Sequence, residues 1–353
     1  MRVTARAGVL HLVRADDWWL YHLLPLLAAA YASIAFYAVA PAVAYPAVAR
    51  LILSIVCIAA YAHLINDIGD AEQDAVAGKP DRWRGVSLVW RGAIAAAFLV
   101  CGFGAWVGAG LSARMLELLT VIAALQPVYA LHPLRLKERG GWGLAADALH
   151  THALPTLFCV ALFAQAAGAP VWAPLPLVLT AWAFFVGVRG IVYHQRTDEA
   201  NDRRAGVATF VTRHGSGSSA AFVRRAVFPA ELAALGAAGV ALFPVIPVPV
   251  LAFVAYFALM QLLRAMGMWR VTFADPAPAE RTAYIPLLAF YRSLPAPAFA
   301  LVLALRDARF VPLLAVHLLV FAGPILRQVG DVFRIARPLW WGVRRRLLRA
   351  PGG

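Results

Sequence analysis

Charge is what this sequence most lacks. Asp, Glu, Lys and Arg make up 14% of the chain and hydrophobic residues 62%, whereas about a quarter of the residues of a typical soluble domain are charged. The mean hydropathy is +0.72, so helices of this composition lack the polar faces that a water-soluble enzyme needs. The composition excludes an ordinary soluble domain and indicates a helical protein that crosses a membrane several times.

Cysteine is also scarce. The chain has three, Cys57, Cys101 and Cys159, and each lies within an apolar run. An odd number of buried or lipid-facing cysteines argues against a disulfide framework and against a zinc site. The N-terminal segment 1–19 shows no signal-peptide pattern, because its apolar part is short and no small-residue cleavage site follows it.

Acidic residues are outnumbered by basic ones, 18 to 32, for a net charge of +14. Most of the arginines lie between apolar runs and in the tail RRRLLRA. This distribution is typical of loops that meet anionic lipid headgroups on the cytoplasmic side, so we expect a lipid bilayer and no nucleic acid as partner.

Ten apolar segments recur along the chain, each long enough, or nearly so, to cross roughly 30 Å of hydrocarbon. Arg292 and several prolines interrupt the ninth segment, so nine crossings remain an alternative to ten. We expect an all-α fold, a polytopic transmembrane bundle of nine or ten helices whose kinks surround a central cavity. The segments are 18–40, 45–65, 88–110, 113–131, 148–167, 172–193, 222–243, 246–268, 285–305 and 309–326.

Arginine and lysine also predict orientation. The N-terminus and alternate connections are basic, whereas the connections between them carry no Lys or Arg, which places the N-terminus and the long motif-bearing loops in the cytoplasm. We therefore expect a multi-pass protein of a bacterial inner membrane. Its single transmembrane domain spans 1–330, with pseudo-repeated halves at about 14–167 and 172–326, and a basic cytoplasmic tail follows at 331–353.

Carboxylates gather directly after an apolar run, in HLINDIGDAEQDAVAGKPDR at 63–82. Carboxylates beside hydrocarbon are costly unless a cation meets them. If the helix continues past the apolar run, Asn66, Asp70 and Asp74 recur every four residues and share one face. Carboxylate and amide oxygens, without Cys or His, suit Mg²⁺, which readily bridges protein carboxylates to a phosphate.

A second acidic cluster, DEAND at 198–202, again spaces two carboxylates four residues apart, Asp198 and Asp202. The only two asparagines of the chain, Asn66 and Asn201, each precede an aspartate in these clusters. A lone D-x-x-x-D more often caps a helix or carries solvated charge. Two such clusters on one side of the membrane predict a site for two or more Mg²⁺ around one diphosphate.

A basic segment, YALHPLRLKERG at 129–140, lies between the two acidic clusters. Tyr129 ends an apolar run, and Arg135 and Lys137 follow it. Arg and Lys bind the phosphate oxygens that a metal leaves available. Lys137 and Lys79 are the only lysines of the chain, against 30 arginines, and both lie in the long cytoplasmic loops.

The three segments N-D-x-x-D-x-x-x-D, Y-x-x-x-P-x-R-x-K and D-x-x-x-D resemble the motifs of the UbiA superfamily of membrane-embedded prenyltransferases. The resemblance runs from about Arg14 to about residue 270. It implies a ring of mostly nine transmembrane helices around a central cavity, with the motif loops on the cytoplasmic side. It also implies Mg²⁺-dependent transfer of a prenyl group from a polyprenyl diphosphate to an aromatic or other lipid-forming acceptor.

The resemblance assigns roles to matching positions. The implied metal ligands are Asn66, Asp70, Asp74, Asp198 and Asp202, with Asp67 and Asn201 as their neighbours. The implied diphosphate-binding residues are Arg14, Lys79, Arg82, Arg135 and Lys137. The implied catalytic residues are Asp70, Asp74, Asp198, Asp202 and Tyr129.

DRWRGVS stands where the family often has R-P-[LI]-P-S-G, and this departure keeps two other reactions open at the same metal site. One is phosphoribosyl transfer to a polyprenyl phosphate, and the other is cyclisation of a prenyl chain. A membrane transporter or lipid-binding protein is the non-enzyme alternative. We expect the acids at loop depth and none in mid-membrane, where transport sites use ionisable residues, and this argues against transport.

Three histidines, His150, His152 and His194, are candidate bases for the reaction. Each is more simply interpreted as a polar loop or helix-packing residue.

Overall fold

The computed structural model describes residues 22–76, 78, 83–170, 174–265, 290–291, 293–323, 325–327 and 330, and within 260–265 only the side chain of Leu262. Throughout these residues the regular structure is helical and no strand occurs. The all-α prediction is therefore confirmed.

The helices follow one another through short turns. In chain order they are α3 (Leu24–Phe36), α4 (Pro41–Val76), α5 (Leu88–Gly104), α6 (Ala113–Ala130), η2 (Leu136–Glu138), α7 (Gly141–Ala148), η3 (Leu149–Ala153), α8 (Leu154–Ala166), α9 (Pro174–Arg204), α10 (Phe210–His214), α11 (Ser216–Phe222), η4 (Val223–Val227), α12 (Phe228–Leu242), α13 (Pro247–Ala265), α15 (Pro295–Arg306), η6 (Ala308–Phe310) and α16 (Val311–Val320).

Five helical stretches of the described chain are long and apolar enough to cross a membrane: Pro41–Val76, Ala113–Ala130, Gly141–Ala166, Pro174–Arg204 and Ser216–Leu242. Shorter apolar helices lie within the other apolar segments predicted from the sequence. The helix positions thus agree with a polytopic membrane fold. The two-half repeat stays a prediction.

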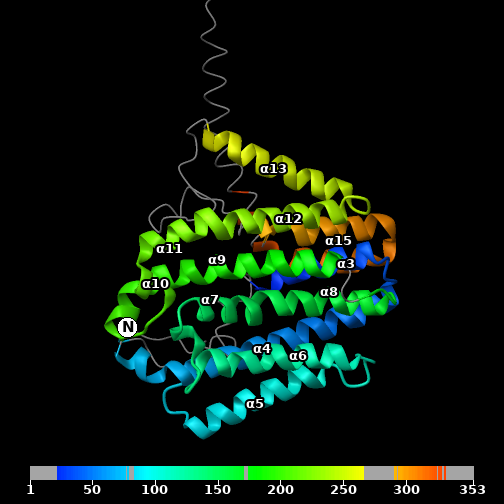
Figure 1. The fold of residues 1–353 in the computed structure, drawn as a ribbon. Helices are drawn as coiled ribbons and strands as arrows, with labels where there is room; N and C mark the ends of the chain where they lie inside the picture. Colours follow the sequence, from blue (N-terminus) through cyan, green and yellow to red (C-terminus); the bar gives the residue numbers. More distant parts are fainter. Residues whose placement is uncertain are drawn as a thin grey trace, which may run out of the picture.

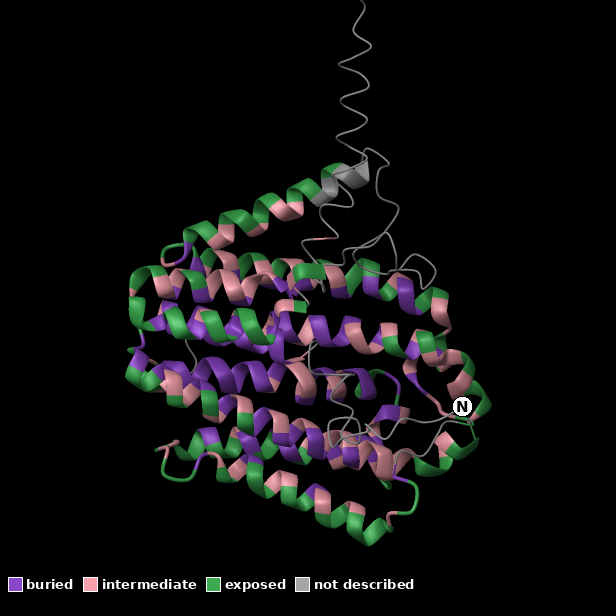
Figure 2. Ribbon diagram, turned by 180° about the vertical axis from the view of Figure 1, so that it is seen from behind, coloured by how far each residue is buried: buried purple, intermediate pink, exposed green. Residues whose placement is uncertain are grey.

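The long helices lie side by side, with α5 at one edge of the bundle and α13 at the other (Figure 1). Helix α4 packs against α5 and α6, α8 packs against α3, α6 and α9, and α9 packs against α12. Buried residues concentrate on the inner helices, whereas α5 and α13 expose most of their surface (Figure 2). Apolar side chains exposed on these edge helices suit a lipid environment.

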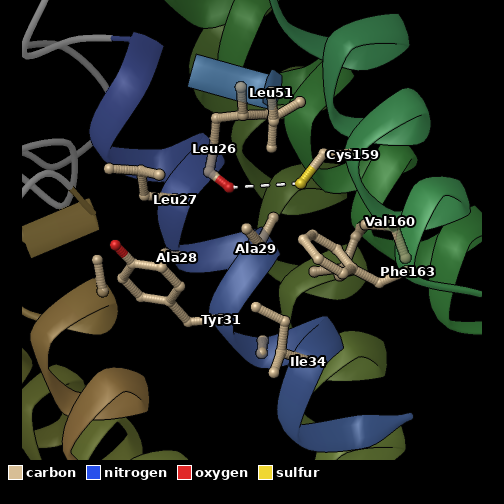
Figure 3. Packing of buried hydrophobic residues seen from close by; sticks show 14 of the residues in the cluster. Leu26, Leu27, Ala28, Ala29, Tyr31, Ile34, Leu51, Cys159, Val160 and Phe163 are labelled. Carbon is tan, nitrogen blue, oxygen red and sulfur yellow. Dashed lines mark hydrogen bonds between the residues drawn. The ribbon is translucent and has the colours of Figure 1, made fainter. Parts of the chain in front are cut away.

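Helix α3 forms the centre of the main hydrophobic core, and nearly every one of its residues is buried. Its small side chains, such as Ala28 and Ala29, let neighbouring helices approach closely. The Cys159 thiol on α8 donates a hydrogen bond to the Leu26 carbonyl at 3.6 Å (Figure 3). The three cysteines are free thiols, of which Cys57 and Cys159 are buried. This agrees with their interpretation as core or lipid-facing residues.

The acidic segments expected as loops are in large part helical. Helix α4 is a single helix of 36 residues that carries the first acidic cluster to Val76, and α9 is a helix of 31 residues that carries the second to Arg204. The first cluster therefore keeps the four-residue helical spacing that its shared face requires.

One expectation about charge is wrong: an acid does lie in mid-span. Glu231 on α12 is fully buried and forms a bidentate pair with Arg189 on α9, with N–O distances of 2.6 and 2.9 Å. The Tyr291 hydroxyl donates to the same carboxylate at 3.0 Å. Glu231 and Arg189 each fall inside a predicted apolar segment, outside the acidic clusters. A buried charge of this kind needs such a partner, since an unpaired one would be too costly.

We predict that Glu231→Ala lowers the free energy of unfolding by about 3 kcal/mol or more, because it leaves the Arg189 guanidinium buried without its counter-charge. Thermal unfolding in detergent measures the loss. The double variant Arg189→Met, Glu231→Leu should be more stable than Glu231→Ala alone, since it removes both charges. Glu117→Ala, on an exposed position of α6, is the control and should change stability by less than about 0.5 kcal/mol. Equal stability of Glu231→Ala and the control would contradict the role of the pair.

Candidate functional site

The first acidic cluster lies on the last turns of α4. Asn66, Asp70 and Asp74 follow one another at four-residue intervals on this helix, and all three are half-buried. They therefore share a face that is turned partly toward the protein, as predicted. Glu72, which lies off that face, is exposed.

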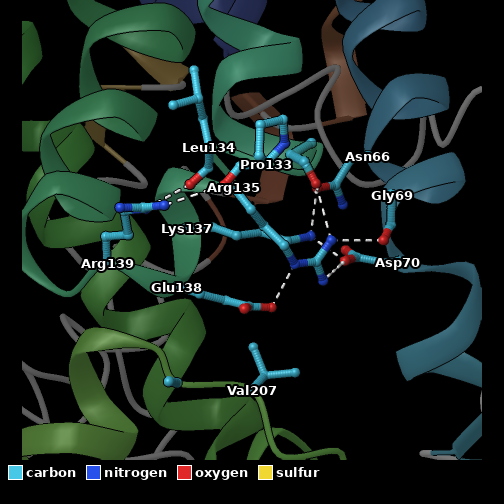
Figure 4. Close-up of polar contacts among 12 residues, drawn as sticks. Asn66, Gly69, Asp70, Pro133, Leu134, Arg135, Lys137, Glu138, Arg139 and Val207 are labelled. Atoms are coloured by element: carbon cyan, nitrogen blue, oxygen red, sulfur yellow. Dashed lines mark hydrogen bonds and ion pairs between the residues drawn. The ribbon is translucent and has the colours of Figure 1, made fainter.

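The connection between α6 and α7 holds this face through Arg135, whose side chain is almost completely buried. Its guanidinium donates to the Asp70 carboxylate at 2.9 Å and to the Gly69 and Ala130 carbonyls at 2.6 and 3.0 Å (Figure 4). Its Nε donates to Glu138 at 2.5 Å. One planar cation thus bridges the end of α4, the end of α6 and the connection itself.

Lys137 provides a second buried cation at the same carboxylate. Its ammonium donates to Asp70 Oδ1 and to Asn66 Oδ1, the latter at 3.3 Å (Figure 4). Burial lowers the pKa of the Lys137 ammonium, and the adjacent Asp70 carboxylate offsets part of this effect. An anion brought to this place would stabilise the charged form of the lysine.

The backbone of the connection is tightly constrained. Arg135 itself adopts a left-handed conformation, with φ of 36°, which is unfavourable for a residue with a side chain. A Cβ added to Gly143 on α7 would lie 2.8 Å from the Leu136 carbonyl oxygen and 2.9 Å from that of Lys137. Glycine at this position lets η2 lie directly on α7. This close packing positions Arg135 and Lys137 so that their side chains reach α4.

Tyr129, at the end of α6, lies between the two acidic clusters. Its buried hydroxyl interacts with the Asp147 carboxyl on α7 and is within electrostatic range of Asp70 on α4 and Asp202 on α9. The structure therefore brings Tyr129, the basic connection and both clusters to the same end of the bundle.

The second cluster occupies the last turns of α9. Asp198 and Asp202 are half-buried and four residues apart on the helix. The exposed His194 imidazole lies 3.8 Å from Asp198. Asn201 accepts a hydrogen bond from Arg204 at 2.5 Å, which gives this side chain a partner on its own helix.

The remaining predicted site residues contact other segments of the protein or lie outside the described part of the chain. The Asp67 carboxylate accepts a hydrogen bond from the Trp83 indole at 3.3 Å, a contact that ties α4 to the segment before α5. Gln195, three residues before Asp198, is buried and accepts a hydrogen bond from the Val211 amide at 3.3 Å. Arg14, Lys79 and Arg82 lie outside the described residues.

The donor set fits a hard divalent cation that brings other oxygen ligands with it. The two helices offer carboxylate and amide oxygens, which suit Mg²⁺. Within the described part of the chain, however, no three His, Cys, Asp or Glu side chains converge as a ready-made metal site. An ion that keeps several waters and binds phosphate oxygens needs only one or two protein carboxylates.

A cavity of about 90 Å³ lies inside the bundle next to this end. We refer to it as the histidine cavity, because His22, His63, His150 and His152 line it together with apolar residues. A larger apolar groove of about 620 Å³ lies among α3, α9, α12, α13, α15 and α16. Pro25 and Trp182 line both spaces.

Sequence reasoning missed two polar residues of this region, Asp147 and Gln126. Asp147 is the acid in contact with Tyr129, and Gln126 lines the histidine cavity. Asp147 gives only a weak signal in the sequence, because an acid directly before a predicted apolar segment normally faces water. Gln126 is the one glutamine in its apolar run, a weaker signal. Of the candidate bases, His150 and His152 line the cavity, whereas His194 is exposed.

Comparisons with known proteins agree with the motif resemblance. A model of the UbiA prenyltransferase family matches residues 23–294. No curated protein matches the sequence.

The fold is similar to solved structures of a UbiA homolog from Archaeoglobus fulgidus. The form bound to GPP and Mg²⁺ is 17% identical with a TM-score of 0.55, and the match covers 87% of this chain and 99% of that one. The form bound to DMAPP and Mg²⁺ is 16% identical with a TM-score of 0.56, covering 85% and 98%. The form bound to Cd²⁺ is 18% identical with a TM-score of 0.54, covering 82% and 96%.

We predict that Gly69→Ala distorts this site. A Cβ at Gly69 would lie 2.6 Å from the Ala130 carbonyl oxygen, so α4 must move away from α6 and the contacts of Arg135 must change. The expected result is a clear loss of thermal stability, measured in detergent. Gly92→Ala on α5, where a Cβ meets nothing within 4 Å, is the matched control and should be neutral or stabilising by up to about 1 kcal/mol. The same unfolding temperature for both variants would refute the close approach.

Proposed function

Because the chain belongs to the UbiA prenyltransferase family, we propose that it is a membrane-embedded enzyme that ionises a polyprenyl diphosphate and transfers the prenyl group to an aromatic or other lipid-forming acceptor. The supporting observation is the arrangement at the end of α4. There Asn66, Asp70, Arg135 and Lys137 contact one another at the edge of an otherwise apolar bundle. Buried cations and half-buried acids at one place are what a metal–diphosphate complex requires.

The basic residues of this end supply the anion site. Arg135 presents a rigid guanidinium suited to phosphate oxygens, and Lys137 presents a point charge. Both are nearly inaccessible to bulk water, so their attraction for an anion is less weakened by solvent. As the allylic carbon–oxygen bond breaks, negative charge grows on the leaving diphosphate, and these cations stabilise it.

The acids would hold the metal. Asp70 and Asp74 from α4 and Asp198 and Asp202 from α9 would bind Mg²⁺, two or more ions, with Asn66 as a further oxygen donor. When bound, Mg²⁺ neutralises diphosphate charge and so favours its departure. The A. fulgidus homolog was solved with GPP or DMAPP together with Mg²⁺, and this supports the assignment of both the donor class and the metal.

The interior of the bundle would receive the organic part of the substrates. The apolar groove, with Phe253, Phe290 and other hydrocarbon walls, suits an isoprenoid chain. Aromatic faces stabilise an allylic cation, and a water-poor site delays its capture by solvent. Tyr129, held against Asp147 near both clusters, would orient the diphosphate end.

We predict that Asp70→Ala and Asp198→Ala each reduce turnover of geranyl diphosphate at least about 100-fold, because each removes charge that binds the metal–diphosphate complex. Diphosphate release from purified protein with Mg²⁺ measures the effect, and chelation of Mg²⁺ should abolish release by the wild type. Asp307→Ala is the control, since Asp307 pairs with Arg309 in the short connection between α15 and α16, away from both clusters.

Turnover by Asp70→Ala or Asp198→Ala at the wild-type rate would refute the metal assignment. Consumption of a phosphoribosyl diphosphate with a polyprenyl phosphate, in place of a prenyl diphosphate, would refute prenyl transfer. A cyclic hydrocarbon formed from the donor alone would identify a cyclase instead.

A further inference from the structure

Histidines gather in one place inside the bundle. Four of the nine in the chain line the histidine cavity. His22 lies two residues before the start of α3, His63 lies on α4, and His150 and His152 belong to the π-helical segment η3. π-Helical turns within longer helices often occur at functional sites. The other walls include Ile55, Ile58, Ile122 and Val186, so the polar groups stand out against hydrocarbon.

Two polar side chains of this cavity, Gln126 and His150, present hydrogen-bond acceptors that can be assigned. The Gln126 amide nitrogen donates to the Ala62 carbonyl at 2.8 Å, which identifies the other atom as its oxygen. That oxygen is buried and has no hydrogen-bond partner among the described residues. A buried acceptor without a donor is costly, so a ligand with a hydroxyl group would be stabilised here.

His150 offers a second acceptor. Its Nδ1 lies 2.6 Å from the Ala146 carbonyl oxygen. A carbonyl only accepts, so Nδ1 carries the proton and the neutral ring has its lone pair on Nε2. If Nε2 takes up a proton, the Ala146 carbonyl stabilises the resulting imidazolium. The ring also packs against Tyr129, with centroids 5.2 Å apart, which places it beside the end of the bundle where the diphosphate would lie.

His22 completes the set. It hydrogen-bonds the backbone of Thr151, while its Nδ1 is buried and lacks a partner in the described part of the chain. Its ring lies 4.5 Å from that of His152. His152 is in turn fixed by Gly187 on α9, where a Cβ would approach the imidazole to 2.9 Å. These contacts leave the rings little freedom to turn away from the cavity.

We propose that the histidine cavity binds the hydroxyl group of the acceptor and that His150 is the catalytic base that removes its proton. The proposal rests on the proposed function, since it concerns the second substrate of the same reaction. It names the acceptor class as an apolar molecule with a nucleophilic hydroxyl. The single hydroxyl hydrogen is accepted by Gln126 Oε1 on binding and passes to Nε2 of His150 in the reaction, while His22 lines the same cavity. None of these residues belongs to the acidic or basic segments.

The bond between C1 of the prenyl group and the diphosphate oxygen breaks, and its electron pair leaves with the diphosphate. A lone pair of the acceptor oxygen forms the new bond to C1. The hydroxyl proton passes to Nε2 of His150. The products are a prenyl ether, diphosphate and a protonated imidazole, which later returns its proton to water.

The test uses the full chain in lipid nanodiscs with Mg²⁺, geranyl diphosphate and benzyl alcohol as a simple apolar hydroxyl acceptor. We expect the wild type to form benzyl geranyl ether, detected by mass spectrometry, and not to be inhibited by benzyl methyl ether, which cannot donate a hydrogen bond. His150→Ala should form the ether at least about 100-fold more slowly, the contribution typical of a general base. Gln126→Leu should raise the KM for benzyl alcohol about tenfold, since it removes a hydrogen bond, with a smaller effect on kcat.

Chemical rescue separates a base from a packing residue. Imidazole added to His150→Ala should restore ether formation, whereas 1,2,4-triazole, which has the same shape but is a far weaker base, should not. Equal rescue by both compounds would overturn the assignment of His150 as the base. His214→Ala is the matched control, because exposed His214 makes the same kind of bond, from Nδ1 to the Phe210 carbonyl at 2.9 Å, and it should retain wild-type transfer.

Donor binding distinguishes failure of this proposal from failure of the proposed function. In the presence of Mg²⁺, geranyl diphosphate should raise the unfolding temperature of both the wild type and His150→Ala. If the donor binds but no ether forms with the wild type, or if His150→Ala transfers normally, the acceptor proposal is wrong. If the donor neither binds nor is consumed, the proposed function itself is wrong.

Discussion

The arrangement of the candidate site depends on one electrostatic constraint, the neutralisation of Asp70 at the border of an apolar bundle. A carboxylate placed there would be unstable without a cation. Arg135 and Lys137 provide two, and the bonds of Arg135 to the Gly69 and Ala130 carbonyls turn this compensation into a mechanical link between α4 and α6. The same charges that stabilise the fold are therefore already gathered where an anionic substrate and its metal would bind. Binding would exchange partners among charges that the protein already holds at this place.

Much of this could be predicted from the sequence. Membrane-crossing helices require long apolar runs, so the helices are predictable from composition. Acids four residues apart lie on one face of any helix, so the shared face of Asn66, Asp70 and Asp74 is predictable from their spacing. The contact of Lys137 with Asp70 was foreseeable as charge complementarity, although not as an atomic contact. The continuation of α4 to Val76 was predicted only conditionally, because a charged segment outside the membrane can be either helix or loop.

The rest depended on tertiary packing, which leaves little trace in one sequence. Glu231 and Arg189 are 42 residues apart, and nothing local indicates that α9 and α12 bring them together. Asp147 was passed over because it directly precedes an apolar segment, where an acid normally faces water. The convergence of His22, Gln126 and His150 needs three separate helical segments to meet at one cavity. A single histidine in any of these segments is common in proteins. Only their position in one shared cavity indicates a site.

The length of α4 determines which way its acids face. At 1.5 Å per residue, α4 extends for about 54 Å, well beyond the roughly 30 Å of a hydrocarbon layer. Its acids are thus rigid continuations of the membrane-embedded part of the helix. One residue inserted or deleted between that part and Asn66 would rotate the whole acidic face by about 100° about the helix axis. The acids would then no longer face Lys137. A change of length inside α4 would therefore reorient the acidic face, whereas one in a connection between helices would leave it in place.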